Sequence, residues 1–256
     1  DTHTGNVAIG YLALEDQDAG ADAYNTAIGY ETGKQITTGA YSVLLGGKAG
    51  DALTTGSHNI AIGYNALSAE DSHGRNVAIG SAALQVQDAG ANAFNVAIGY
   101  DSGQALSTAI RSTLVGGNSG ASITTGQENT FIGYSTGSNT TIGNKNVAIG
   151  GEAMTTNVAA DCNVAVGLEA LKVMTSATTA DTYNTAVGYR AGLSVSTGVK
   201  NTIIGGATGD ALTTGDNNII IGYDAAASAV GVDNEITLGD ANISAFRCAD
   251  QSIVAL

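Results

Sequence analysis

Histidine and cysteine, which often bind metals or act in catalysis, are few in this sequence and stand far apart. His3, His58 and His73 belong to no His-x-His or His-Glu-x-x-His arrangement, the spacings typical of a metal site. Cys162 and Cys248 match no metal-ligand spacing and indicate no disulfide framework. We therefore interpret the histidines as exposed loop residues. The sequence predicts no metal site, no catalytic residue and no cofactor, so we do not expect an enzyme.

The acidic residues offer a second candidate chemistry, the binding of calcium. Segments 15–18 and 85–88 carry carboxylates, and calcium binds several oxygen atoms at once. Neither the glycine-rich nonapeptide of calcium-binding β-rolls nor the helix-loop-helix calcium pattern occurs in the chain. The acidic residues form no recognisable catalytic pair for polysaccharide cleavage, although a pair made of carboxylates from two chains stays an open alternative. We interpret the acidic segments as solvated loop charge.

Aromatic residues form the third candidate group, because stacked rings bind sugars. Tyr24, Phe94 and Tyr183 close three longer segments of the chain; we interpret them as anchors of these loops, with contact to a receptor as the alternative. A ladder of rings is also expected where neighbouring coils share a corner, and we favour this structural interpretation for the tyrosines that follow a recurring glycine. Seven of the 10 tyrosines do so: Tyr11, Tyr30, Tyr64, Tyr100, Tyr134, Tyr189 and Tyr223.

Composition restricts the class of protein. The 23 acidic and 9 basic residues give a net charge of −14, which disfavours binding to nucleic acid or to an anionic membrane. An apolar fraction of 43% without proline argues against ordinary disorder. With 3 Phe and no Trp a wide globular core is not expected, and 36 glycines indicate a periodic structure. Since the chain has no run of 18 apolar residues, we expect no membrane insertion.

The elements that position these residues come from an internal repeat. A phrase of the form Asn-Val-Ala-Ile-Gly occurs 14 times, and a 17-residue step separates successive copies except for two steps of 19 and one of 21. Valine and isoleucine favour a strand, and glycine favours a left-handed corner after it. The repeat glycines are Gly10, Gly29, Gly46, Gly63, Gly80, Gly99, Gly116, Gly133, Gly150, Gly167, Gly188, Gly205, Gly222 and Gly239.

A 17-residue period is the length of one coil in a parallel β-solenoid. We predict an all-β parallel solenoid (β-roll) of about 14 short coils over residues 1–239 and a capping segment over 240–256. Each coil is expected to contain one strong strand, a weaker second segment, and an entry asparagine that forms a ladder along the stack. The three long steps are expected to bulge outward on one side, at residues 15–24, 85–94 and 172–183.

The strand pattern also indicates oligomerisation. In Val77-Ala78-Ile79, the first and third side chains face one way and the second faces the other. One apolar face fills the narrow coil. The second, expected to consist of small apolar residues, would form a long exposed stripe in a monomer. We expect identical chains to pack against this stripe and cover it. The pattern does not determine how many chains associate.

Two resemblances add to this interpretation. The phrase Asn-x-Ala-Ile-Gly-x-x-Ala resembles the β-roll heads of trimeric autotransporter adhesins, and the chain more closely resembles bacteriophage tail fibres and tailspikes, with their runs of Asn-Thr-Ala-Ile-Gly-Tyr-x-Ala-Gly. The segment 234–243, followed by Arg247 and Cys248, is similar to the region before an endosialidase-type intramolecular chaperone. In that family the chaperone assembles the trimer and then cuts itself off. The resemblance implies that Leu256 is a processed C-terminus and that the chaperone is absent here.

The resemblance implies a structural protein of the virion: a homotrimeric tail fibre that attaches to a host surface. The partners expected from it are two identical chains, other tail or baseplate proteins, and a host receptor, either a glycan or an outer-membrane component. A bacterial trimeric adhesin on the cell surface is the first alternative and differs in the segment expected after Leu256. A glycan- or ice-binding solenoid is the second and requires a regular Thr-x-Thr on every coil, whereas Thr-Thr-Gly occurs only at 37–39, 54–56, 124–126 and 213–215.

Overall fold

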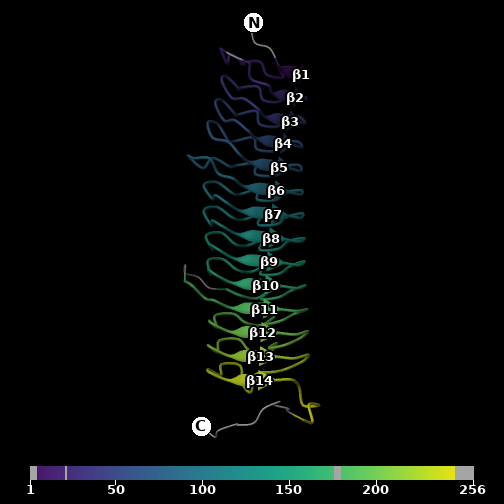
Figure 1. The fold of residues 1–256 in the computed structure, drawn as a ribbon, viewed down its shortest axis with the longest axis vertical. Coiled ribbons are helices and arrows are strands. Elements are labelled where there is room, and N and C mark those ends of the chain that lie inside the picture. The colour runs from purple at the N-terminus through teal and green to yellow at the C-terminus, as the bar shows by residue number, and fades with distance from the viewer. Residues whose placement is uncertain (1–4, 21, 176–179, 246–256) are drawn as a thin grey trace, which may run out of the picture.

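A computed structural model describes residues 5–20, 22–175 and 180–245, which fold into the predicted parallel β-solenoid (Figure 1). In these residues fourteen strands pair in sequence order within one sheet, without a helix. None of the described segments forms a helix able to cross a membrane. The strands are β1 (Val7–Ile9), β2 (Thr26–Ile28), β3 (Val43–Leu45), β4 (Ile60–Ile62), β5 (Val77–Ile79), β6 (Val96–Ile98), β7 (Thr113–Val115), β8 (Thr130–Ile132), β9 (Val147–Ile149), β10 (Val164–Val166), β11 (Thr185–Val187), β12 (Thr202–Ile204), β13 (Ile219–Ile221) and β14 (Ile236–Leu238).

The strands stack in register along the long axis of the molecule (Figure 1). Ala78, for example, pairs with Ala61 on one side and with Ala97 on the other. Because neighbouring strands lie about 4.8 Å apart, the stack is about 60 Å long. Each described repeat glycine from Gly10 to Gly222 ends its strand at a φ between 126° and 145°, so the predicted left-handed corner is confirmed.

The solenoid interior is narrow and is filled by compensation between two positions of a coil or between adjacent coils. Where the strand centre is large, as at Phe131, the residue six positions later is glycine. A Cβ placed on Gly137 would lie 2.3 Å from the Phe131 ring. Where the centre is small, as at Ala78, the same position holds Leu84, and both side chains are fully buried. In the coil of β6 both positions are small, Ala97 and Gly103, and leucines of the adjacent coils fill the space: a Cβ placed on Gly103 would lie 2.8 Å from Leu114 and 3.0 Å from Leu84.

An asparagine precedes most of the strands and forms the predicted ladder. The backbone N–H of Asn76 donates to Oδ1 of Asn59 at 3.0 Å, and that of Asn95 donates to Oδ1 of Asn76 at 3.2 Å. Nδ2 of Asn95 also donates to the carbonyl oxygen of Ala109 at 2.8 Å. The three asparagines are fully buried, so these hydrogen bonds satisfy groups that water does not reach.

We expect replacement of Asn201 by leucine to weaken this ladder by about 2 kcal/mol, because buried polar groups without partners each cost about 1–3 kcal/mol. Oδ1 of Asn201 accepts the N–H of Asn218 at 2.9 Å, and its Nδ2 donates to the carbonyl oxygen of Gly215 at 2.8 Å. Both partners would lose their hydrogen bond. Amide hydrogen exchange measures the opening free energy of these coils directly.

Asn201→Ser is the matched control, since serine occupies the same position in the coil of β3. There Oγ of Ser42 accepts the N–H of Asn59 at 3.2 Å, so serine keeps one rung of the ladder. We expect its cost to stay below about 1 kcal/mol. If the leucine and serine variants lose the same protection from amide exchange, the asparagine ladder is not the cause of the lost stability.

The weaker second segment of each coil consists of turns and not of a strand. The N–H of Thr37 still donates to the carbonyl oxygen of Thr54 at 2.9 Å, and that of Thr54 donates to Asp71 at 2.5 Å. Neighbouring coils are therefore bonded on this side as well. Glycines such as Gly39 and Gly56 follow the threonines and end the extended backbone within a few residues.

The loops that the three long repeat steps form project from the rod. Gly20 and Gly90 lie in two of these loops, and no atom lies within 4 Å of a Cβ placed on either glycine. In Figure 1 the loop between β5 and β6 stands out on the side where the described parts of the other two long loops also lie. This confirms the predicted outward bulge on one side.

Candidate interaction surface

Exposed apolar side chains gather on the outer sheet face, which we define as the first and third residues of strands β1 to β14. The middle residue of each strand points inward and is buried from β2 to β13. None of the fourteen described strands contains a charged residue. The exposed large apolar side chains of this face are Val7, Ile9, Ile28, Val43, Ile98, Ile132, Ile149, Val187, Ile204, Ile219, Ile221, Ile236 and Leu238.

The expectation that small residues form the exposed stripe is wrong. Ala78 fills the interior, whereas Val77 and Ile79 lie on the outer face and are only partly buried. The reason is the interior volume of this coil, since the buried Leu84 leaves room only for alanine at the strand centre. The outer sheet face is consequently more hydrophobic than the sequence predicted. A continuous apolar surface of this length is unusual in a monomer.

The tyrosines that follow the repeat glycines form a second exposed column beside the outer sheet face. Their exposed fractions range from 49% at Tyr189 to 76% at Tyr223. Tyr11 and Tyr30 stack with their ring centroids 5.6 Å apart. Further along, glycine, serine or leucine separates the tyrosines, and a Cβ placed on Gly117 would lie 3.6 Å from the Tyr134 ring. Among the described rings of this column, the predicted stacking is therefore confirmed only for the first pair.

The rings that close the long loops are half-exposed and also contact the rod. Tyr24 stacks on Tyr41 with a centroid distance of 5.8 Å, and Tyr41 stacks on His58 at 5.1 Å. The guanidinium carbon of Arg75 lies 5.5 Å from the centroid of the Phe94 ring. These contacts support the anchoring interpretation for Tyr24 and Phe94. Contact with a receptor stays a prediction.

Tyr183, the third ring, is fixed by a carboxylate. Its hydroxyl donates to Oδ2 of Asp181 at 2.6 Å, which raises the pKa of the phenol and lowers that of Asp181. The thiol of Cys162 lies 3.3 Å from the other oxygen of Asp181, and burial is the main cause that raises the pKa of this thiol. A raised thiol pKa is the opposite of what a nucleophilic cysteine requires. Cys248, His3 and Leu256 lie outside the described residues.

A polar depression of about 400 Å³ lies near Tyr183 on the loop side of the rod. It presents amides, carboxylates and one ammonium group, which suit a polar ligand such as a carbohydrate. No aromatic side chain is part of its described lining. Its residues are Gln127, Glu128, Asn144, Lys145, Asp161 and Asp181.

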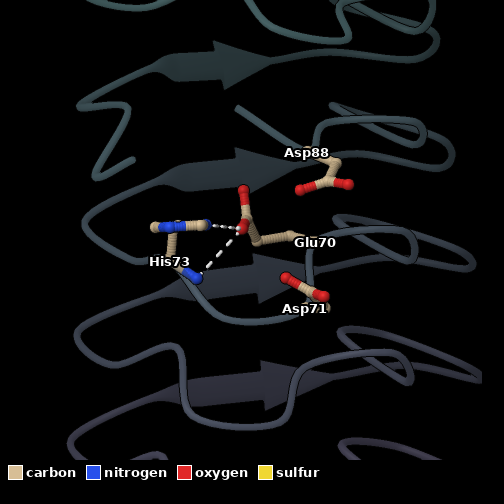
Figure 2. A group of neighbouring side chains, drawn as sticks. All are labelled: Glu70, Asp71, His73 and Asp88. Atoms are coloured by element: carbon tan, nitrogen blue, oxygen red, sulfur yellow. Dashed lines mark hydrogen bonds and ion pairs between the residues drawn. The ribbon is translucent and has the colours of Figure 1, made fainter. Parts of the chain in front are cut away.

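A cluster of titratable side chains lies in the coil between β4 and β5 and in the loop after β5. Glu70, Asp71, His73 and Asp88 each place one oxygen or nitrogen atom within 4.8 Å of the others (Figure 2). Burial raises the pKa of Glu70, whereas the hydrogen bond from Ser72 lowers that of Asp71. We call these four side chains the Glu70 cluster.

The sequence prediction placed His73 and Asp88 in separate solvated loops and did not consider Glu70. A signal was present, because Glu70 stands one repeat period after the buried Leu53 and so occupies a core position of its coil. Asp88 likewise stands one period after Asp71, which places the two on neighbouring coils. The repeat period alone would have brought the acids together.

Comparison with known proteins adds no relative. No protein-family model matches the chain, and neither the curated proteins nor the solved structures contain a significant match.

Proposed function

We propose that this chain is one subunit of a homotrimeric fibre, a rigid structural rod that provides reach and attachment to a host surface as part of a viral tail. The observation that carries the proposal is the outer sheet face. It is uncharged and largely apolar over the described strands, with threonine at the first position of five of them, on a chain with a net charge of −14. Such a surface is stabilised by exclusion from water, since apolar burial contributes about 25 cal/mol per Å².

A second copy of the same chain fits this surface better than an unrelated partner. The side chains of the outer sheet face recur once per coil, at about 4.8 Å. A parallel copy has the same spacing and matches it at every coil, whereas a globular partner covers only a few coils. The trimeric state and the viral setting are inferred from the resemblance to tail fibres and trimeric adhesins, in which three chains share one axis.

The coil stack also suits a mechanical role. Each coil is bonded to its neighbours by strand pairing, by the asparagine ladder and by the threonine turns, so stability accumulates from coil to coil. The stiff rod would hold its exposed rings, loops and polar depression at fixed positions for contact with a glycan or an outer-membrane receptor.

The oligomeric state tests the proposal. We expect native mass spectrometry and sedimentation to give a trimer for the natural chain. Ile149→Glu, at the middle of the outer sheet face, should weaken association by at least about 100-fold, because a buried unpaired charge costs several kcal/mol. Val158→Glu is the matched control, since Val158 has a similar exposed fraction but lies in a turn outside the sheet. A monomeric natural chain, or a trimeric Ile149→Glu variant, would contradict the proposal.

The product of the complete gene separates the viral fibre from the cell-surface adhesin. A trimer whose chains end at Leu256, together with a smaller released fragment, is expected for a fibre matured by a self-cleaving chaperone. An intact mass that shows an uncut chain continuing past Leu256 would favour the adhesin.

A further inference from the structure

Glu70 is a carboxylate at a buried coil position that elsewhere holds apolar or neutral polar side chains. Leu53 precedes it by one coil and Gln87 follows it by one coil, and both are fully buried. The side chain of Glu70 is also fully buried. A buried carboxylate is costly unless it is paired or bound to a cation.

The carboxylate of Glu70 is only partly satisfied by its neighbours. Its Oε1 accepts the backbone N–H of His73 at 3.0 Å and lies 3.4 Å from Nδ1 of the same residue. Its Oε2 is buried and has no hydrogen-bond partner in the described part of the chain. Figure 2 shows the carboxylate between the His73 ring on one side and the carboxylates of Asp71 and Asp88 on the other. A buried acceptor therefore points into a group of further potential ligands.

Asp71 and Asp88 stand at coil positions that elsewhere hold threonine or serine, such as Thr54, Ser107 and Thr124. Two carboxylates on adjacent coils repel each other, and Glu70 adds a third. Within the described ranges no Lys or Arg side chain forms an ion pair with any of the three. The imidazole of His73 is the one basic group of the cluster.

The backbone ladder between coils is interrupted at this place. The N–H of Thr54 donates to the carbonyl oxygen of Asp71 at 2.5 Å, and the N–H of Asp88 donates to that of Ser107 at 2.8 Å. Among the described backbone hydrogen bonds, none joins Asp71 to Asp88, the step between these two. The same hydrogen bond is missing between Val158 and Thr175, which also precede a long loop, so Asp71 and Asp88 lie where two coils are joined by one backbone hydrogen bond fewer.

We propose that Glu70, Asp71, His73 and Asp88 bind a divalent transition-metal cation, with Zn²⁺ as the best-suited ion, and that the ion joins two neighbouring coils. Three carboxylate oxygens and one imidazole nitrogen are a donor set that Zn²⁺ and Mn²⁺ accept, whereas calcium takes six to eight oxygens. Ligands about 2.0–2.2 Å from a shared ion lie at most about 4.4 Å from one another. The four atoms lie within 4.8 Å of one another, so small rotations of the exposed Asp71 and Asp88 close the site.

The same pattern occurs a second time in the sequence. Asp1 and His3 have the spacing of Asp71 and His73, and Asp18 follows Asp1 by one repeat period as Asp88 follows Asp71. In the coil before the third long step, the positions equivalent to Asp71 and His73 hold valine and alanine, at 158 and 160. The acids and the histidine therefore recur as a set or are absent as a set. Residues 1–4 lie outside the described structure, and the proposal rests on the Glu70 cluster alone.

Calorimetric titration of the full chain with Zn²⁺ tests the proposal. The His3→Asn variant, without an affinity tag, serves as the background, so that the second pattern does not contribute. One equivalent of Zn²⁺ per chain is expected. Glu70→Gln, which keeps the shape of the side chain, should weaken binding by at least about 100-fold, because losing an outer-shell partner alone costs about 10–100-fold. His58→Asn is the control and should bind as the background does.

Hydrogen exchange gives an independent measurement on the same proteins. Zn²⁺ should slow amide exchange in residues 70–92 of the background chain and leave the Glu70→Gln variant unchanged. If Glu70→Gln does not fold, Asp88→Asn, at an exposed position, takes its place. The proposal is overturned if the background chain binds no Zn²⁺, if the Glu70 and Asp88 variants bind it as tightly as the background does, or if Ca²⁺ binds more tightly than Zn²⁺.

Discussion

Replacing Gly116 by alanine is expected to destabilise the solenoid by at least about 3 kcal/mol, because strained backbone and forced backbone separation each cost about 1–3 kcal/mol. Gly116 follows β7 at a φ of 132°, a conformation that side chains rarely adopt. A Cβ on this residue would lie 2.3 Å from the carbonyl oxygen of Gly133 in the next coil. That oxygen belongs to the backbone, so the only relief is to move two coils apart.

Gly117, the next residue, provides the control. Its φ is not positive, and the nearest atom to a Cβ there is a Tyr134 ring carbon at 3.6 Å, an ordinary contact distance. We expect Gly117→Ala to change the free energy of unfolding by less than about 1 kcal/mol. Denaturant unfolding with hydrogen exchange around β7 and β8 measures both variants. A similar loss of stability in the two would refute the structural role that we assign to the repeat glycines.

The second large effect is expected in the core, where Phe131→Ala should cost about 3–5 kcal/mol. Phe131 is fully buried, and Gly137 lies against its ring without a side chain that could fill the space. Phe131→Leu should cost only about 1 kcal/mol, since Leu114 with Gly120 shows that the coil accommodates leucine at this position. Thermal and denaturant unfolding of the three proteins gives these differences.

A double variant tests the compensation itself. Phe131→Ala combined with Gly137→Leu reproduces the arrangement of Ala78 and Leu84, in which leucine adopts a φ of 49°. The φ of Gly137 is 57°, so leucine at this position meets a backbone that other coils already tolerate. We expect the second substitution to recover about 2 kcal/mol of the loss. If Gly137→Leu adds to the damage instead, the two positions do not share one volume.

The strands were predictable because the repeat gives both their number and their ends. Val77–Ile79, for example, ends directly before Gly80, as each strand ends before its repeat glycine. The face that turns inward was not predictable from the strand, since both faces of Val77-Ala78-Ile79 are apolar. It depends on Leu84, which fills the interior from elsewhere in the coil. The local pattern contains no information about that volume.

The side-chain contacts were predictable only where coil spacing alone decides them. Asp71 and Asp88 are one period apart and follow from the repeat, but the inward direction of Glu70 depends on the path of the turn around it. The same holds for the exposed rings. Tyr11 and Tyr30 stack, whereas Tyr134 lies beside Gly117 because the preceding coil lacks a ring.

The in-register parallel stack also determines how the rod bears load. Hydrogen bonds between strands run along the long axis, so tension applied at the two ends passes through every coil junction in series. Adding coils makes such a rod longer without making it stronger. Its breaking force is that of the weakest junction. Without a bound ion, a pulled chain should first open at the steps from Asp71 to Asp88 and from Val158 to Thr175, where the backbone ladder is interrupted.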